Sequence, residues 1–451
     1  MPHVIHGPDD PIAALATPMA SSALAVIRVS GEGCLPLLSK LVKGGPPLLE
    51  RRSHTIGRCV IRDGSEDVDE VMLAVYRAPR SYSGEDSAEI ICHGSIPVIQ
   101  RLLSLLARSG FRPAGPGEFT QRAFLNGRMD LTRAEAVNEI VRARTDRARG
   151  LALQRLGGAI ESRIGAAREG LVQLKAGLEA AIDYPDDVAE GEGVSLDVLD
   201  RTVSLLEELT RTFRQGRIYQ EGVSVAIAGA TNSGKSSLFN AMLRQERAIV
   251  SEVHGTTRDW LEGSVSLEGI PVRLFDTAGL RVTSDPLEAE GMRRTEQVIS
   301  GADIVIYLVD STRGKDRKDD AFMAGAAGVP VIRAWNKADL PGLPAPDGFI
   351  LLSATTGAGL QQLEAAVAAE ALGGAPAQSG EPLIHSVRQR DLIARALSAL
   401  ERLREGHAAG ASADLLAVDL ADALDALGEI TGEVTTAEIL ERMFADFCVG
   451  K

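Results

Sequence analysis

The stretch from 223 to 243, which reads VSVAIAGATNSGKSSLFNAML, constrains the fold of this chain more than any other segment. It joins an apolar run typical of a buried strand, the pattern G-x-x-x-x-G-K-S, and a segment with helical spacing. Gly229 and Gly234 let the loop turn tightly, so that backbone N–H groups and the helix N-terminus face phosphate oxygens. An accidental glycine-rich turn is the weaker interpretation, because a strand precedes the loop and a helix follows it. The stretch therefore predicts a nucleotide-binding α/β domain.

The side chains of this loop have separate expected roles. We expect Lys235 to reach the β- and γ-phosphates and to act in catalysis, and Ser236 to ligate Mg²⁺. The loop residues expected to contact the nucleotide are Asn232, Ser233, Gly234, Lys235, Ser236 and Ser237.

Three later motifs indicate which base is bound. VRLFDTAG places Asp276 at a strand end, near the Mg²⁺ shell, and VIRAWNKAD places Asp339 where its carboxylate accepts from guanine N1–H and N2–H₂. Adenine offers neither donor, and an unpaired carboxylate there is costly. ILLSAT adds a backbone N–H, from Ala354, for guanine O6. The sequence therefore predicts a GTPase whose further contacts are Asp276, Thr277, Ala278, Gly279, Asn336, Lys337, Ala338, Asp339, Ser353 and Ala354.

The segment HGTTRD, between the first two motifs, is expected to be the switch loop, with contacts from His254, Gly255, Thr256 and Thr257. Thr257 is expected to bind Mg²⁺ when the γ-phosphate is present. Leu280 occupies the place where Ras-like enzymes have a glutamine that orients water. Another group must do so, and the acids available are Asp285, Glu288 and Glu290. A monovalent cation held by the Asn232 side chain can supply the positive charge.

Composition narrows the class of protein. The formal net charge of −14 argues against a surface coated with positive charge for indiscriminate nucleic-acid binding. No apolar run reaches about 18 residues, so no membrane-spanning helix is expected. The N-terminus lacks a secretory signal pattern. The four cysteines show no metal-ligand spacing, which fits a reducing cytoplasm.

The order of sequence patterns predicts a multidomain α/β and α protein. Residues 1–124 alternate short β-rich runs with turns and predict an α+β domain. Residues 125–221 and 373–451 are helical, and residues 222–372 alternate strands with helices, which predicts a mainly parallel sheet. The economical arrangement is one helical domain, split by an inserted nucleotide-binding domain. Seven arginines lie between 122 and 149; a solvated helix face and an RNA contact both stay open for them.

The end of the chain, FCVGK, follows a predicted helix, TTAEILERMFADF, with a capping box from Thr435 to Glu438. Its apolar stripe is Ile439, Leu440, Met443, Phe444 and Phe447. We expect this helix to deliver a mobile tail whose thiol, Cys448, is exposed. A frayed terminus is the alternative interpretation.

Several segments together give the chain a specific family resemblance. ALATPMASSALAVIRVSG, YSGEDSAEI, PGEFTQRAFLNGRMDL and the terminal C-x-G-K, combined with the GTPase motifs, resemble the MnmE family, also called TrmE, of tRNA modification GTPases. The resemblance covers essentially the whole chain. It implies an N-terminal folate-binding and dimerisation domain, a split helical domain and an inserted G domain in a homodimer. It also implies a heterotetramer with an FAD-dependent partner, MnmG (GidA).

In the activity that the resemblance implies, the two proteins add an aminomethyl-type group at C5 of the wobble uridine of certain tRNAs. A tetrahydrofolate derivative, 5-formyl- or 5,10-methylene-tetrahydrofolate, supplies the one-carbon unit. GTP is hydrolysed with Mg²⁺ and K⁺, and the G domains meet across a gap where potassium is bound.

The resemblance also implies roles for individual residues. Asn232 matches the potassium ligand of the phosphate loop, and Ser251, Val253 and Thr256 fall in the loop that completes that shell, where Glu252 also lies. Glu288 matches the glutamate that positions water, and Cys448 matches the tail cysteine. The implied folate contacts are Arg28, Glu89, Arg128 and Lys451.

Three departures from the family pattern qualify these roles. Thr231 stands where proline is usual, so the phosphate loop is less rigid. MASSA replaces a glycine-rich run before Arg28 and puts the entry to the folate pocket in doubt. Arg128 replaces a lysine, which keeps the charge but changes a point donor into a planar fork.

Two interpretations from other classes compete with the tRNA-modifying enzyme. A ribosome-assembly GTPase would act as a binding switch and is expected to carry a basic RNA-binding domain after the G domain, whereas this C-terminal segment is acidic and helical. A scaffold GTPase that only switches partners leaves the folate-like motifs and the tail cysteine unexplained.

Overall fold

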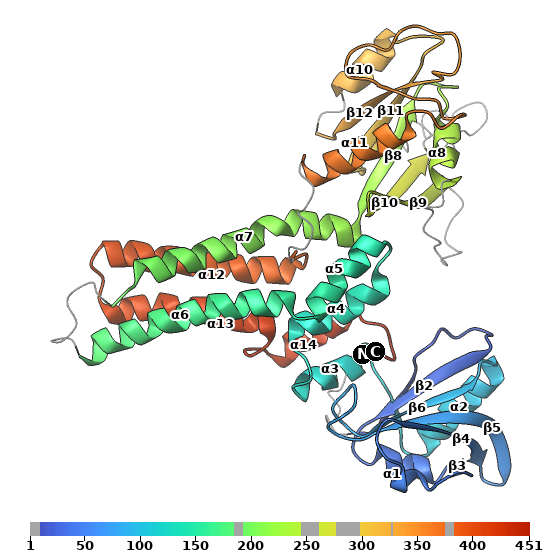
Figure 1. The fold of residues 1–451 in the computed structure, drawn as a ribbon, viewed down its shortest axis with the longest axis vertical. Helices are drawn as coiled ribbons and strands as arrows, with labels where there is room; N and C mark the ends of the chain where they lie inside the picture. The colour runs from blue at the N-terminus through green and yellow to red at the C-terminus, as the bar shows by residue number, and fades with distance from the viewer. Residues whose placement is uncertain (1–9, 185–192, 245–260, 277–297, 326–327, 375–382) are drawn as a thin grey trace, which may run out of the picture. The chain divides into compact units, whose positions relative to one another are not determined.

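The structure is a computed structural model that describes residues 10–184, 193–244, 261–276, 298–325, 328–374 and 383–451. It divides into two compact units (Figure 1). Unit 1 comprises Met1–Asn138 with Gly428–Lys451, and unit 2 comprises Glu139–Leu427. Residues far apart in the sequence therefore fold together in unit 1.

The described residues of unit 1 form a seven-stranded sheet in the order β3-β4-β5-β6-β2-β1-β7. Its strands are β1 (Ile12–Leu15), β2 (Leu24–Ser30), β3 (Val42–Lys43), β4 (Thr55–Asp63), β5 (Glu66–Tyr76), β6 (Ser87–His93) and β7 (Arg112–Pro113). Neighbouring strands are antiparallel except β1 and β7, which are parallel. The alternating β-rich runs of the sequence thus become strands, as predicted.

Helices lie against this sheet. The α1 helix (Cys34–Ser39), the 3₁₀ turn η1 (Leu48–Glu50) and the α2 helix (Ile96–Arg108) share one core with it, whereas α3 (Glu118–Leu125) buries Phe119 against Ile12 and Ala14. In α2 the residues at helical spacing, Ile99, Leu102 and Leu106, are buried against strand residues such as Ile27 and Ile90. This apolar contact between helix and sheet is the main core of unit 1, and it confirms the α+β prediction.

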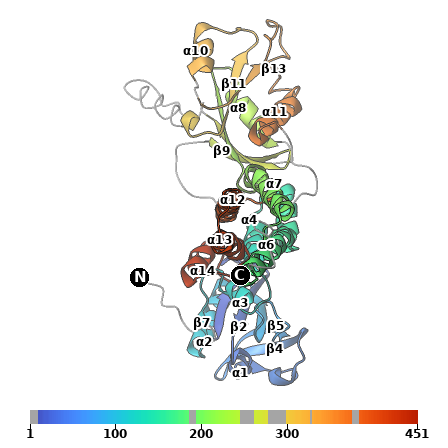
Figure 2. The same ribbon diagram turned by 90° about the vertical axis from the view of Figure 1, so that its left-hand side faces the viewer.

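The chain's last helix, α14 (Ala437–Phe444), completes unit 1 by packing beside α3 (Figures 1 and 2). Leu440, Phe444 and Phe447 are buried against Leu131, at the start of α4 (Leu131–Arg142). The helix cap is one residue from its predicted place: the Thr436 side chain, not Thr435, accepts from Ile439 N, at 3.4 Å. Thr436 has the extended backbone that a capping residue needs.

The tail after α14 is docked, so the expectation of a mobile tail is wrong for its backbone. Gly117 N donates to Cys448 O at 3.2 Å, and Pro116 and Val449 form a β-bridge. Gly117 has a left-handed φ of 62°, and a Cβ there would lie 2.8 Å from Phe447 Cβ. Glycine is therefore required where the tail crosses.

The helical part of unit 2 consists of α5 (Asp146–Leu156), α6 (Ala159–Asp183), α7 (Leu196–Glu221), α12 (Val387–Ala408) and most of α13 (Ala413–Thr431). The α7 helix begins after Ser195, the predicted N-cap residue, and lies alongside α6 and α12 (Figures 1 and 2). Segments before and after the G domain thus pack together, as the split-domain prediction requires. Within the described ranges, no helix combines the length and apolar character needed to cross a membrane.

The remainder of unit 2 contains, in its described residues, a six-stranded sheet in the order β13-β12-β11-β8-β10-β9. The strands are β8 (Val223–Gly229), β9 (Leu261–Leu267), β10 (Ile270–Asp276), β11 (Ile304–Asp310), β12 (Val331–Asn336) and β13 (Ile350–Leu351). Only β9 is antiparallel to its neighbour. The accompanying helices are α8 (Lys235–Arg244), α10 (Arg317–Gly325) and α11 (Leu360–Leu372). This confirms the predicted parallel-sheet α/β domain.

A buried polar cluster holds the segment around Leu383 and His385, which follows the last helix of this sheet domain, against α5. Arg155 on α5 is 2% exposed and donates to Glu139 Oε2 at 2.6 Å and to Leu383 O at 2.8 Å. His385 Nε2 lies 3.2 Å from the same glutamate. Burial, followed by the charge of Arg155, lowers the pKa of His385 to about 3, so this imidazole is neutral in the folded protein.

Candidate functional site

The phosphate loop lies between β8 and α8, at the carboxyl edge of the sheet. Gly234 has a φ of 99°, and a Cβ there would lie 2.2 Å from Asn336 Nδ2. A Cβ at Gly229 would lie 2.3 Å from Leu308 O. Both positions therefore need glycine, and the backbone they allow forms a cradle of N–H groups at a helix N-terminus.

The loop side chains are arranged around this cradle. Lys235 Nζ lies 2.9 Å from both Gly229 O and Ala230 O, which holds the ammonium group over the loop. Asn232, Ser236 and Ser237 are exposed. The Ser233 hydroxyl is buried without a hydrogen-bond partner among the described residues, a costly state that a polar ligand relieves.

The base-recognition motifs meet the phosphate loop through one asparagine. Asn336, at the end of β12, is 1% exposed; its Nδ2 donates to Ser233 O at 2.7 Å, and its Oδ1 accepts from Ala354 N at 3.0 Å. The N–H expected to meet guanine O6 is thus engaged by this side chain. Through these two hydrogen bonds, Asn336 connects the end of β12 to the phosphate loop and to the segment of Ala354.

The carboxylate expected to read guanine is exposed and oriented. Asp339 accepts from Ser353 Oγ at 2.5 Å. Lys337, in the left-handed region at φ 67°, pairs with Asp310 at 2.6 Å. Burial alone would raise the pKa of Asp310, but hydrogen bonds from Lys337 and Thr312 bring it below its ordinary value. Carboxylates and an ordered loop at the ends of parallel strands can hold a purine nucleotide.

The described residues include some of the expected ligands of each cation: Ser236 for Mg²⁺ and Asn232 for K⁺. Ser236 follows the lysine at the start of α8, and Asp276 is buried at the end of β10. These residues fit a hard cation beside a phosphate. Among the described side chains, no group of three or more His, Cys, Asp and Glu residues is placed to hold a metal.

Part of the predicted nucleotide site lies outside the described residues. The expected contacts concerned are Ser251, Glu252, Val253, His254, Gly255, Thr256, Thr257, Thr277, Ala278 and Gly279, together with Leu280 and the acids Asp285, Glu288 and Glu290. Their roles stay predictions.

A second site lies in unit 1, on neighbouring strands. Arg28 on β2 is the register partner of Glu89 on β6, and two guanidinium nitrogens donate to Glu89 Oε1, at 3.1 and 2.8 Å. The Arg28 guanidinium also lies 5.4 Å from the centre of the Tyr82 ring and 5.6 Å from that of Phe119. These side chains line a cavity of about 190 Å³, whose full lining is Arg28, Ser30, Tyr76, Tyr82, Ser83, Ser87, Glu89 and Phe119.

The tail reaches the rim of this cavity. Arg28 Nη1 donates to Gly450 O at 3.1 Å, and Lys451 follows directly. Cys448 is exposed, as predicted, whereas Cys34, Cys59 and Cys92 are buried. The structure thus brings Arg28, Glu89 and the tail together. It places Arg128 in a neighbouring cavity instead.

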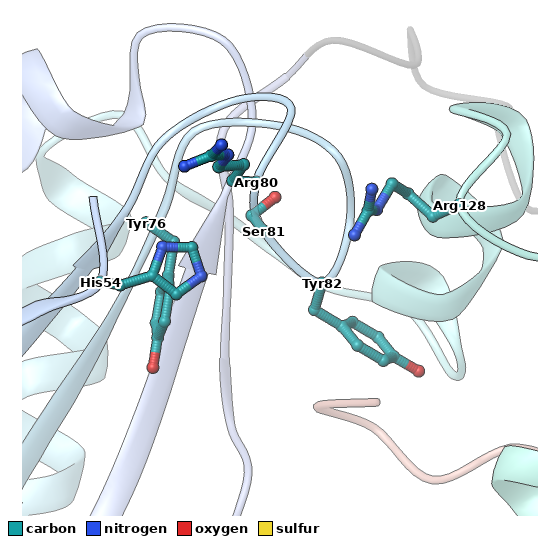
Figure 3. Close-up of a pocket in the computed structure, with 6 residues that line it drawn as sticks. All are labelled: His54, Tyr76, Arg80, Ser81, Tyr82 and Arg128. Atoms are coloured by element: carbon teal, nitrogen blue, oxygen red, sulfur yellow. The ribbon is translucent and has the colours of Figure 1, made fainter.

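That neighbouring cavity, of about 470 Å³, is lined by His54, Tyr76, Arg80, Ser81, Tyr82 and Arg128 (Figure 3). Tyr76 and Tyr82 line both cavities and form the wall between them. Sequence reasoning named Arg128 alone from this lining. Tyr82 lies within the segment YSGEDSAEI, which could have indicated it, but nothing local marked His54 or Arg80.

Burial affects the tyrosines of this wall. It raises the pKa of Tyr76, and the neighbouring Glu89 carboxylate raises it further. Burial also raises the pKa of Tyr82, whose hydroxyl lies 2.8 Å from Thr120 Oγ1. Both phenols are therefore neutral, and their rings offer flat apolar surface beside a carboxylate that can accept from N–H donors.

Comparison with known proteins decides the family. Residues 11–128 match the family described as "GTP-binding protein TrmE N-terminus", and residues 131–448 match "MnmE helical domain". The chain belongs to the MnmE family.

Curated members of the MnmE family match along their whole length. The chain is 41% identical to the tRNA modification GTPase MnmE of Treponema denticola over 463 aligned residues, covering 98% of each chain. It is 42% identical to the tRNA modification GTPase MnmE of Moorella thermoacetica, covering 98% of this chain and 100% of the relative. The predicted family and its multidomain fold class are therefore confirmed.

Solved structures match part of this MnmE-family chain. A crystal structure of a variant of Aquifex aeolicus Era bound to GDP·AlF4⁻ is 25% identical and covers 39% of this chain and 66% of its own, with a TM-score of 0.28. That score is too low to bear on function.

Proposed function

We propose that this chain is a GTP-hydrolysing tRNA modification enzyme. With an FAD-dependent partner of the MnmG type, it adds an aminomethyl-type group at C5 of the wobble uridine of certain tRNAs. The observation that carries the proposal is a chain of the MnmE family with two separate sites. One is the nucleotide edge around Asn336, and the other is the Arg28–Glu89 cavity, whose rim holds a tail with an exposed thiol.

At the nucleotide edge, Lys235 and the loop N–H groups bind the phosphates, and Asp339 selects guanine over adenine. Ser236 and Thr257 would hold Mg²⁺, which would neutralise charge on the phosphates. Asn232, with Ser251, Val253 and Thr256, would hold K⁺, which would supply the positive charge of an arginine finger. Glu288 orients the attacking water, because Leu280 cannot form a hydrogen bond with it. G domains of two chains in a homodimer complete this arrangement.

The residues of the Arg28–Glu89 cavity fit a reduced folate. Glu89 uses one oxygen for Arg28 and the other, at 3.5 Å, for Tyr76, which leaves acceptor capacity for the N–H donors of a pterin. The rings of Tyr82 and Phe119 offer a flat surface for it. A tetrahydrofolate derivative would supply the one-carbon unit when bound. Arg28 and Arg128 face its anionic or polar groups, and Lys451 is a further contact. Cys448 stands beside this site as a catalytic residue of the tail whose thiol is needed for the modification.

We further propose the division into residues 1–124 for folate binding and dimerisation, 125–221 and 373–451 for the helical domain, and 222–372 for the G domain. A cytoplasmic location fits tRNA and a reducing environment for the Cys448 thiol.

Reconstitution tests this function. The full chain is incubated with the FAD-dependent partner, undermodified tRNA, GTP, Mg²⁺, K⁺, 5,10-methylene-tetrahydrofolate and, in separate arms, ammonium or glycine as the source of the amine nitrogen. The modified nucleoside is measured by mass spectrometry. Modification should require GTP and the folate, and sodium in place of potassium should lower GTP turnover several-fold. Cys448→Ser should abolish modification while GTP turnover and the melting temperature stay unchanged. Val449→Ser, a change at the adjacent exposed residue, is the matched control and should keep modification.

GTP turnover without any modified nucleoside in the complete mixture would instead indicate a binding switch of the ribosome-assembly or scaffold kind. Equal turnover in potassium and sodium at matched ionic strength would contradict the cation role of Asn232. Normal modification by Cys448→Ser would leave the tail thiol without a function.

A further inference from the structure

The cavity of Figure 3 includes, besides Arg128, two polar residues to which the proposed function assigns no role, Arg80 and Ser81. Among the described residues that line it, the polar groups are basic or neutral: Arg80 and Arg128 carry permanent charges, and none is a carboxylate. Within the described part of the chain, neither guanidinium group forms a hydrogen bond or an ion pair. By contrast, the nearby Arg28 and Arg77 are paired with Glu89 and Asp86. The N–H donors of Arg80 and Arg128 are thus available to a ligand in this cavity.

A buried hydroxyl points to a ligand in the same cavity. Ser81 is 6% exposed, and its Oγ has no hydrogen-bond partner among the described residues. Figure 3 shows this oxygen on the side of the cavity where the Arg80 and Arg128 side chains also lie. A buried polar group without a partner costs free energy, which an acceptor on a bound molecule would recover.

The walls of the cavity are held in place by packing and hydrogen bonds. Asn126 Nδ2 donates to Ser83 O at 2.8 Å, which ties the segment of Ser81 to the segment of Arg128. Gly84, at φ 83°, approaches the Arg128 stem so closely that a Cβ there would lie 3.3 Å from Arg128 Cγ. On the other side, the His54 ring meets Tyr76 edge-on, with centroids 5.4 Å apart. The cavity is therefore a built site and not a gap between mobile side chains.

We propose that this cavity binds the γ-linked glutamate chain of a polyglutamylated folate, so that the protein prefers folate polyglutamates to the monoglutamate. The inference rests on the proposed folate site in the adjoining Arg28–Glu89 cavity. The two cavities share the residues Tyr76 and Tyr82, so a folate whose pterin contacts Glu89 can extend its glutamate end past these rings into the second cavity. Each added glutamate brings one carboxylate, and guanidinium groups bind carboxylates with paired hydrogen bonds.

Calorimetric titration of the full chain with the monoglutamate and pentaglutamate forms of 5-formyltetrahydrofolate tests the inference. The pentaglutamate should bind about 3- to 10-fold more tightly, the size that one or two exposed ion pairs contribute. Higher salt should reduce this preference, because the arginines are exposed. Arg80→Ala should reduce the preference toward unity, and Arg80→Glu should remove it, while monoglutamate affinity stays unchanged. Arg58→Ala removes an exposed arginine that lies outside the cavity lining and should leave the preference intact.

The outcomes separate this inference from the proposed function. Equal affinities for the two folates in the unaltered protein would overturn the inference and leave the folate site standing. No binding of either folate would overturn both. A preference that survives Arg80→Glu would overturn the inference, as would Arg80→Glu variants that lose tRNA binding while the folate preference persists, because the arginines would then serve RNA.

Discussion

The nucleotide edge of unit 2 and the folate-like cavity of unit 1 are assembled in opposite ways. At the nucleotide edge, each motif is a short continuous segment, and the parallel strands bring the segment ends together. In the cavity, β2, β5, β6, α3 and the segment around Tyr82 each contribute one or two side chains, and the tail contributes the backbone carbonyl of Gly450. The geometry of the nucleotide edge is therefore set mainly within its own loops. The Arg28–Glu89 cavity forms only when distant parts of unit 1 have packed together. The comparison predicts that changes in packing should affect the two sites unequally.

The largest expected effect comes from removing an aromatic ring below the tail. Phe444→Ala deletes a side chain that is 2% exposed, and such changes typically cost about 3–5 kcal/mol. Hydrogen exchange should show a destabilised unit 1, and folate affinity should fall. Both tryptophans of the chain, Trp260 and the buried Trp335, belong to residues 222–372, so tryptophan fluorescence should report an unchanged transition of that domain.

Leu415→Ala, at an exposed position on α13, is the control and should change neither unit. Phe444→Ala could instead lower the stability measured by tryptophan fluorescence as much as it lowers the hydrogen-exchange protection of unit 1. The two units would then unfold together, and the contrast between their sites would disappear.

A smaller effect is expected at the nucleotide edge. Asp339→Asn removes the carboxylate that accepts from guanine, and a hydrogen bond to a charged group contributes about 1.5–3 kcal/mol, or roughly 10- to 150-fold in affinity. GTP affinity should fall by that factor, and binding of xanthosine triphosphate should improve, because its C2 carbonyl accepts from the new amide. Folate affinity should not change.

Asp347→Asn changes an exposed carboxylate later in the same domain and serves as the matched control. Unchanged GTP affinity in Asp339→Asn, or an equal loss in Asp347→Asn, would contradict guanine recognition by Asp339.

The smallest effect concerns the polar cluster where the chain leaves the G domain. His385 has a pKa of about 3 when folded, against an ordinary value of about 6.5 when unfolded. The unfolded state therefore binds the extra proton, so stability is lost as pH falls from about 6.5 toward 3. At pH 5.5 this loss should be about 1 kcal/mol.

Urea unfolding of unit 2, followed by Trp335 fluorescence at pH 7.5 and 5.5, measures this loss. His385→Gln should flatten the pH dependence by that amount, and His407→Gln, near the end of the α12 helix that follows His385, should not. A pH dependence equal in all three proteins would show that His385 does not contribute.

The sequence allowed most of the fold and the nucleotide edge to be predicted, because periodicity and loop motifs are local. Asn336, Lys235 and Asp339 lie where the motifs placed them. Other features depend on tertiary packing: Thr436 replaced Thr435 as the cap, and the tail backbone docks through Gly117 and Val449. His54, Arg80 and Ser81 come together only through the folding of the sheet and its connections, so no spacing in the sequence indicated their cavity.

The packing of α14 in unit 1 has a consequence for biosynthesis. A ribosome finishes the N-terminal sheet long before it makes Leu440 and Phe444, which cover Leu131 and Ala134. At roughly 5–20 residues per second, the roughly 300 residues between take about 15 to 60 s to synthesise. During that interval the nascent unit presents an uncovered apolar patch, and a prematurely terminated chain presents it permanently. Chaperones and proteases that recognise such surface can therefore distinguish truncated chains from finished ones, and the first domain to be made is the last to mature.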